Sequence, residues 1–120
     1  MKIRIIIEGM KFLAELNKSE TARRIYRSLP IEGFFSTWGS EVYFEIPVKC
    51  EAENQKQEVE IGDLGYWLEG GCFCIFYGKT PASTSQKPKA ASPVNVFGKI
   101  IGDATKLKTV SGNKVRVEKA

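Results

Sequence analysis

The segment that decides the fold class is Glu41-Val42-Tyr43-Phe44-Glu45-Ile46-Pro47. Every second residue in it is apolar, namely Val42, Phe44 and Ile46. This period of two is typical of a β-strand that turns one face toward a core. Pro47 ends the strand, because proline has no N–H group to donate to a neighbouring strand.

Further strands are predicted on both sides of this segment. A turn at residues 8–11 separates the first two, and the last two are predicted to pair through residues 111–113. The run 72–77 is apolar throughout, which predicts a strand that is covered on both faces. We count about eight strands, from nine candidate segments at residues 3–8, 12–16, 41–46, 58–61, 66–67, 72–77, 94–101, 107–110 and 115–117.

One helix and one long loop interrupt the strands. The helix is predicted to begin after Asn17 and Ser19, which are good capping residues. Its apolar stripe consists of Ala22, Ile25, Tyr26 and Leu29. Pro30 ends it. Residues 78–93 hold three prolines among serines, alanines and lysines. They predict a long loop, and long loops inside a compact domain are usually functional or mobile.

The composition predicts a single domain over residues 1–120. A chain of 120 residues with 42% hydrophobic and 27% charged residues can bury a core without disulfides or a metal. Strands at this spacing with one helix predict an antiparallel barrel or sandwich, in which the helix covers one open end. The net charge of +4 is spread along the chain and interrupted by glutamates. We therefore expect a mixed polar surface and no nucleic-acid partner.

The expected cellular location follows from the absence of a membrane span and of a signal-peptide pattern. No apolar run approaches the ~20 residues of a membrane span. Residues 1–8 do not have the pattern of a signal peptide. We expect a cytoplasmic protein without membrane contact, whose three cysteines are reduced thiols.

Several motifs occur in a fixed order along the chain. They are Leu29-Pro30, the segments 38–44 (WGSEVYF), 62–67 (GDLGYW) and 75–83 (IFYGKTPAS), and the segment 92–98 (SPVNVFG). Together they resemble a family of small prokaryotic cyclophilin-like proteins of unknown function. The run 96–101 (VFGKII) also resembles a late barrel strand of the cyclophilins themselves. The resemblance implies a mainly β fold, a closed eight-stranded cyclophilin-like barrel with one main helix capping an end.

The resemblance also implies where a proline isomerase would carry its catalytic groups. Cyclophilins place an arginine on the strand that here ends at Pro47, and the matching position falls near Phe44. The strand 41–46 contains no arginine or lysine, the run 72–76 lacks the cyclophilin glutamine, and the chain has no histidine. An enzyme that lacks a preorganised hydrogen-bond donor loses most of its catalytic rate. We expect no strong proline isomerase activity and assign no catalytic residue.

Metal and nucleophile chemistry finds little support in the residue types. Cys72 and Cys74 lie on one side of a predicted strand. With no histidine and only Cys50 to add, we interpret them as core residues and not as half of a zinc site. A nucleophilic serine is not expected, because no histidine is present to activate it. We predict no metal and no cofactor.

The candidate ligand-binding residues are Trp38, Glu41, Tyr43, Tyr66, Trp67, Thr80, Ser83 and Asn95. The aromatic ones either line a ligand cleft or cap the barrel core. Thr80 and Ser83 offer hydroxyls to a ligand or brace the loop, and for Asn95 bracing is favoured. Glu41 and Glu45 share a strand face, either as an acid–base pair or as exposed partners of ion pairs.

The sequence therefore predicts a binding module for a small ligand or a peptide. One alternative is a weak peptidyl-prolyl cis–trans isomerase, or another enzyme that acts on a small metabolite through Glu41, Glu45 or Lys79. A third possibility is a regulatory subunit that binds a protein partner.

Overall fold

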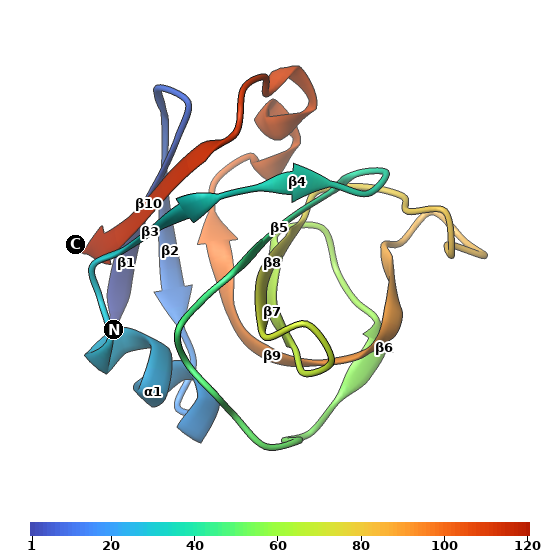
Figure 1. Ribbon diagram of the computed structural model, residues 1–120. Coiled ribbons are helices and arrows are strands. Elements are labelled where there is room, and N and C mark those ends of the chain that lie inside the picture. Colours follow the sequence, from blue (N-terminus) through green and yellow to red (C-terminus); the bar gives the residue numbers. More distant parts are fainter.

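Antiparallel strands make up most of the computed structural model, which describes all of residues 1–120 (Figure 1). The strands are β1 (Lys2–Ile7), β2 (Met10–Leu16), β3 (Ile31–Phe34), β4 (Ser36–Thr37), β5 (Glu41–Glu45), β6 (Lys56–Glu58), β7 (Asp63–Trp67), β8 (Cys72–Phe76), β9 (Lys89–Ile101) and β10 (Lys114–Lys119). The helices are α1 (Glu20–Arg27) and a 3₁₀-helix at Ala104–Thr109. The predicted mainly β class with one main helix is confirmed.

The strands form one curved sheet in the order β3-β10-β1-β2-β9-β7-β8-β5-β4, with β6 pairing β9 at the side. The two end strands, β3 and β4, follow each other in the chain and are joined through Phe35. No ladder of hydrogen bonds pairs them, so hydrogen bonds do not close the sheet. Ten strands form where about eight were predicted, because β3 and β4, only four and two residues long, were not predicted. Strands that short leave no alternation to detect.

Two apolar clusters lie on opposite faces of this sheet. The inner cluster has 25 buried residues and includes Val42, Phe44 and Ile46, the apolar face predicted for the segment 41–47. The outer cluster has six: Val59, Cys72, Cys74, Phe76, Ala90 and Val94. All five residues of β8 are buried, so the predicted covering of both faces of this strand is confirmed. The cover on its outer face includes Ala90 and Val94, from the first half of β9.

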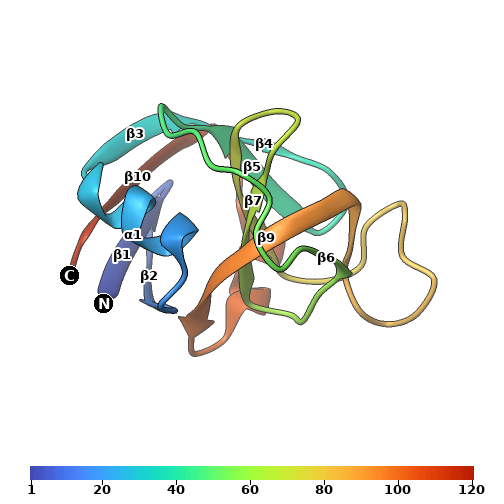
Figure 2. The same ribbon diagram turned by 90° about the horizontal axis from the view of Figure 1, so that it is seen from below.

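Helix α1 forms where its capping residues predict. The Ser19 hydroxyl accepts a hydrogen bond from the Ala22 N–H at 3.1 Å, as an N-cap side chain does. Ala22 and Ile25 are buried in the inner cluster. The helix lies beside β1 and β2, close to the two termini (Figures 1 and 2). The termini adjoin because the Ala120 N–H donates to the Lys2 carbonyl at 3.1 Å.

The predicted loop at residues 78–93 is too long at its C-terminal end. Strand β9 already begins at Lys89, and Pro93 lies inside it. Proline is tolerated there because the register between β6 and β9 shifts between the pairs Lys56↔Val94 and Glu58↔Lys89. Figure 2 shows the remaining connection between β8 and β9 projecting beyond the sheet.

The predicted pairing of residues 107–110 with 115–117 is wrong. Residues 104–109 form the 3₁₀-helix, whose cap is the Asp103 carboxylate accepting from the Thr105 N–H at 3.0 Å. Strand β10 instead pairs with β1 and β3. A local side-chain cap thus replaces the strand at this point in the chain.

Candidate functional site

The turn between β4 and β5 places Trp38 beside Glu41. The Trp38 N–H donates to the Glu41 carbonyl at 2.9 Å and closes the turn. Gly39 within the turn has a φ of +59°, and an added Cβ would lie 2.9 Å from the Thr80 Cα. Only glycine fits a left-handed backbone so close to another segment. The turn is therefore clamped against the start of the β8–β9 connection.

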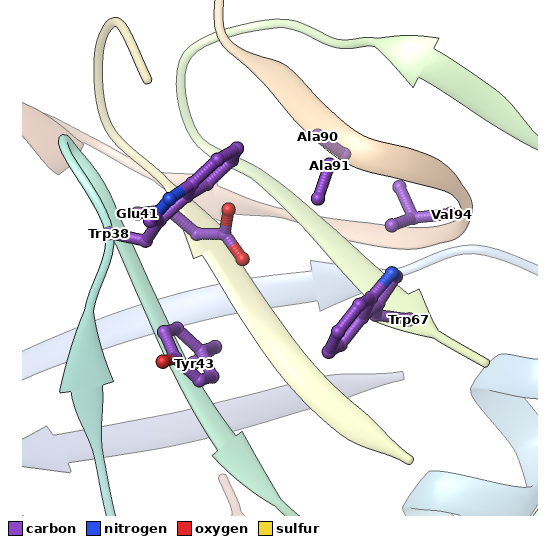
Figure 3. Close-up of a pocket in the computed structure, with 7 residues that line it drawn as sticks. All are labelled: Trp38, Glu41, Tyr43, Trp67, Ala90, Ala91 and Val94. Atoms are coloured by element: carbon purple, nitrogen blue, oxygen red, sulfur yellow. The ribbon is translucent and has the colours of Figure 1, made fainter. Parts of the chain in front are cut away.

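A pocket of about 270 Å³ opens on the outer face of the sheet, above β5, β7 and the first half of β9. Its lining residues are Trp38, Glu41, Tyr43, Trp67, Ala90, Ala91 and Val94. In Figure 3 the Glu41 carboxylate points into the space between Trp38 and Trp67, and the β9 side chains lie across from it. One acidic group thus faces six apolar or aromatic side chains.

Glu41 has an unusual environment for a carboxyl group. Its side chain is only 7% exposed, and no N–H or O–H group of the protein donates to it. It takes part in no ion pair. Removal from water penalises the charged form, and this burial raises the pKa of Glu41 from its ordinary 4.5 to about 7. A hydrogen bond with the Cys74 thiol opposes the shift.

The Trp67 ring is held in place from two sides. Its Nε1–H donates to the Ser92 Oγ at 2.7 Å, and the Ser92 hydroxyl donates in turn to the Glu69 carboxylate. On the other side the ring packs on Gly70, where an added Cβ would lie 2.6 Å from the Trp67 Cζ3. The indole therefore forms a rigid wall of the pocket.

The groups around Glu41 carry no positive charge. From β8, the Cys72 and Cys74 thiols face it, and burial raises the pKa of both. They are neutral near pH 7. None of the lining residues is a lysine or arginine. The pocket therefore holds one titratable carboxyl group without a compensating cation.

The structure brings together four of the eight candidate residues: Trp38, Glu41, Tyr43 and Trp67 line the pocket. Tyr66 does not, because its ring lies in the inner cluster and its hydroxyl donates to the Val48 carbonyl at 2.7 Å. Tyr66 therefore packs in the core, which is one of the two roles that the sequence predicts for the aromatic residues.

The polar candidates lie outside the pocket and are engaged elsewhere. The Thr80 hydroxyl donates to the Lys89 carbonyl, and the Ser83 hydroxyl donates to the Lys87 carbonyl at 2.9 Å. Both side chains brace the β8–β9 connection. Asn95 is buried, and its Nδ2 donates to the Glu51 carbonyl at 2.8 Å and to the Thr21 hydroxyl at 3.0 Å. It ties β9 to α1 and to the segment before β6.

The proposed carboxylate pair of Glu41 and Glu45 is not a pair within this pocket. Glu45 is exposed at the far end of β5, opposite Cys72, and does not line the pocket. Lys79 does not line it either.

Sequence reasoning missed the β9 wall. Ala90 and Ala91 were expected in the loop and Val94 at the start of the next strand, whereas all three stand on β9, which crosses the sheet. The only local signal is the pair of small residues Ala90-Ala91, which leaves space above the sheet.

Two wider features bear on the chemistry. No three His, Cys, Asp or Glu side chains converge in a way that could hold a metal ion. Neither helix has the length and apolarity needed to cross a bilayer.

Comparisons with known proteins give a consistent result. A family model described as "Cyclophilin-like" matches residues 1–118. No curated protein matches the chain. Among solved structures, the chain is similar to the solution structure of the hypothetical protein AF2241 from Archaeoglobus fulgidus. The two sequences are 41% identical, the TM-score is 0.84, and the match covers 100% of this chain and 95% of the other.

Proposed function

Since this chain belongs to the cyclophilin-like family over residues 1–118, we propose that it has the non-enzymatic binding role that the sequence predicts. The protein would then hold a small ligand in the pocket above β5, β7 and β9. The observation that carries this proposal is Glu41, a carboxyl group that is 7% exposed, has no cationic partner and is directed into an open pocket between two tryptophans.

A buried carboxyl group without a cationic partner lowers stability, which makes its presence informative. Burial of a charge without a partner costs several kcal/mol. Groups with strongly shifted pKa values gather at functional sites. An apolar pocket with a few converging polar groups is the usual form of a small-molecule site. Glu41 among its aromatic neighbours fits this description.

The size of the pocket limits the ligand. Its volume of about 270 Å³ lies just below the ~300 Å³ at which drug-sized pockets begin. The ligand is therefore a small molecule or a single side chain of a peptide. A folded protein surface would contact the rim and place only one side chain inside.

The residues at the isomerase position support a role in binding without strong proline isomerase activity. Phe44, near which the resemblance places this position, is 2% exposed and stacks on Phe73 with ring centroids 4.9 Å apart. The five arginines lie on β1, α1 and β10, away from the pocket. No guanidinium therefore stands ready to favour a pyramidal proline nitrogen.

Fluorescence titration tests the proposal, because both tryptophans of the chain line the pocket. The probes are butanol, butyramide, butyrate and butylammonium, which share one chain and differ in the head group. We expect at least one of them to change the emission saturably in Trp38→Phe, where Trp67 reports, and in Trp67→Phe, where Trp38 reports.

Variants at Ala91, an exposed lining residue, provide the controls. Ala91→Phe fills the pocket and should abolish the response, whereas Ala91→Ser leaves the space open and should retain it. Binding that persists unchanged in Ala91→Phe, or no saturable response to any probe, would contradict the proposed site.

A further inference from the structure

We propose that the ligand presents an alkylammonium group, which binds between the Glu41 carboxylate and the aromatic side chains of Trp38 and Trp67. This inference rests on the proposed binding function and names the chemical class of the ligand. The ammonium group can belong to a free amine or to a lysine side chain of a peptide, because the pocket accommodates one chain and its head group.

The first argument is charge. Glu41 is the only charged lining residue, and no lysine or arginine competes for it. A cation that enters the pocket therefore meets a carboxylate that has no cationic partner in the protein and whose only hydrogen-bonding neighbour is the Cys74 thiol. Hydrogen bonds between an ammonium and a carboxylate are about twice as strong as those between neutral groups. An anion would instead meet a group of like charge.

The second argument is the aromatic lining. Trp38, Tyr43 and Trp67 stand around Glu41 (Figure 3). Aromatic rings attract a cation through the negative charge on their faces, tryptophan most strongly, and the attraction grows when water is excluded. A neutral polar ligand gains nothing comparable from two tryptophans.

The third argument is rigidity and shape. The Trp67 indole is fixed by Ser92 and Gly70, so little ordering is needed when a ligand binds. The Ser92 hydroxyl is itself bonded to the Glu69 carboxylate, which adds a second negative group on the Trp67 side. Ala90, Ala91 and Val94 provide an apolar wall for the alkyl chain.

A protonated Glu41 could instead donate a hydrogen bond to a neutral amide, and pH separates the two cases. The groups facing Glu41 are the Cys72 and Cys74 thiols of β8 and the Tyr43 phenol of β5, while β7 and β9 contribute no ionisable lining residue. Cation binding requires the ionised carboxylate, so it strengthens as the pH rises. Donation of a hydrogen bond to an amide requires the protonated carboxyl group, so binding of an amide weakens as the pH rises.

Isothermal titration of the four butyl probes tests the inference. We expect butylammonium to bind at least about tenfold more tightly than butanol or butyramide, and butyrate to bind most weakly. With a free-state pKa of about 7, the ionised fraction of Glu41 rises about tenfold between about pH 6 and about pH 8, and the affinity for butylammonium should rise with it.

Two glutamate variants complete the test. Glu41→Gln should lose about tenfold or more in affinity for butylammonium, together with the pH dependence. Glu45→Gln removes an exposed carboxylate from the same strand outside the pocket and should bind as the parent does. Far-ultraviolet circular dichroism of both variants shows that they are folded.

The outcomes distinguish a failure of the alkylammonium inference from a failure of the proposed binding function. The alkylammonium inference would be wrong if butanol or butyramide bound as tightly as butylammonium or more tightly. It would also be wrong if Glu41→Gln left the affinity for butylammonium unchanged. In both cases the pocket would still be a binding site. No binding by any probe would overturn both the inference and the proposed function. Nα-acetyl-lysine amide and a glycine-flanked lysine peptide, compared with butylammonium, distinguish a peptide side chain from a free amine as the source.

Discussion

At the scale of single residues, Glu41 sets the balance between stability and binding. Its carboxyl group is buried without a cationic partner, and its pKa is raised to about 7. In the unfolded chain the group loses its proton near 4.5. Between these two values the folded state holds more protons than the unfolded state, so folding becomes less favourable as the pH rises. Above about pH 7 the penalty is fully present.

Glu41→Gln should therefore stabilise the protein selectively at high pH. The amide carries no charge, so the variant escapes the penalty. We expect its free energy of unfolding relative to the parent to increase by about 3 kcal/mol between about pH 4.5 and about pH 8. Urea unfolding of both proteins across this range measures it. A difference that is the same at both ends of the range would mean that Glu41 is ionised in the fold at its ordinary pKa.

At the scale of elements, the pocket depends on how β7 leads into its turn. Trp67 is the last residue of β7, and the turn that follows brings Gly70 under its ring. The Cβ of any larger residue would lie 2.6 to 2.7 Å from the Cζ3 and Cε3 atoms of Trp67. The position of this wall is therefore decided by a glycine that does not line the pocket itself.

Gly70→Ala should displace the Trp67 ring and weaken its bond to Ser92. We expect the Trp67 indole N–H resonance to shift in a nitrogen–proton correlation spectrum, and the folded state to lose about 1–3 kcal/mol through overpacking. Gly33→Ala is the matched control, because its Cβ would meet the Phe44 Cδ2 at 3.6 Å, an ordinary contact. An unchanged Trp67 resonance in Gly70→Ala would contradict the assignment of the ring position to Gly70.

At the scale of the whole molecule, the two ends of the sheet meet at one residue. Strand β3 pairs with β10 as far as Phe34, and β4 pairs with β5 from Ser36. Phe35 lies between them, 6% exposed in the inner cluster, and its N–H donates to the Asn113 carbonyl at 2.7 Å. With no ladder between β3 and β4, packing of this side chain holds the junction.

Phe35→Ala should therefore destabilise the fold strongly, by about 3–5 kcal/mol in urea unfolding, as is usual for a buried phenylalanine. The adjacent Phe34 is 71% exposed, and Phe34→Ala should change the free energy of unfolding by no more than about 0.5 kcal/mol. Similar losses for the two neighbours would contradict the assignment of the junction to Phe35.

The sequence by itself determined the elements whose signals are local. Alternation within residues 41–47 places Val42, Phe44 and Ile46 on the inner face, and the structure agrees. Ser19 and Pro30 bracket α1, and the apolar run of β8 predicts its double cover. Ordered motifs along the chain were enough to indicate the family. Each of these features depends on residues that are close in sequence or on a period that a strand imposes.

The tertiary structure decided the pocket. A period of two places Glu41 on the outer face of β5, but whether that face is exposed or buried depends on which segment crosses it. Here the first half of β9 lies over the sheet, with Ala90 and Val94 packed beside β8. That crossing buries the carboxyl group and leaves the space above it. Pairing between segments some thirty to forty residues apart is a property of the folded chain, because no local signal records which strand becomes a neighbour.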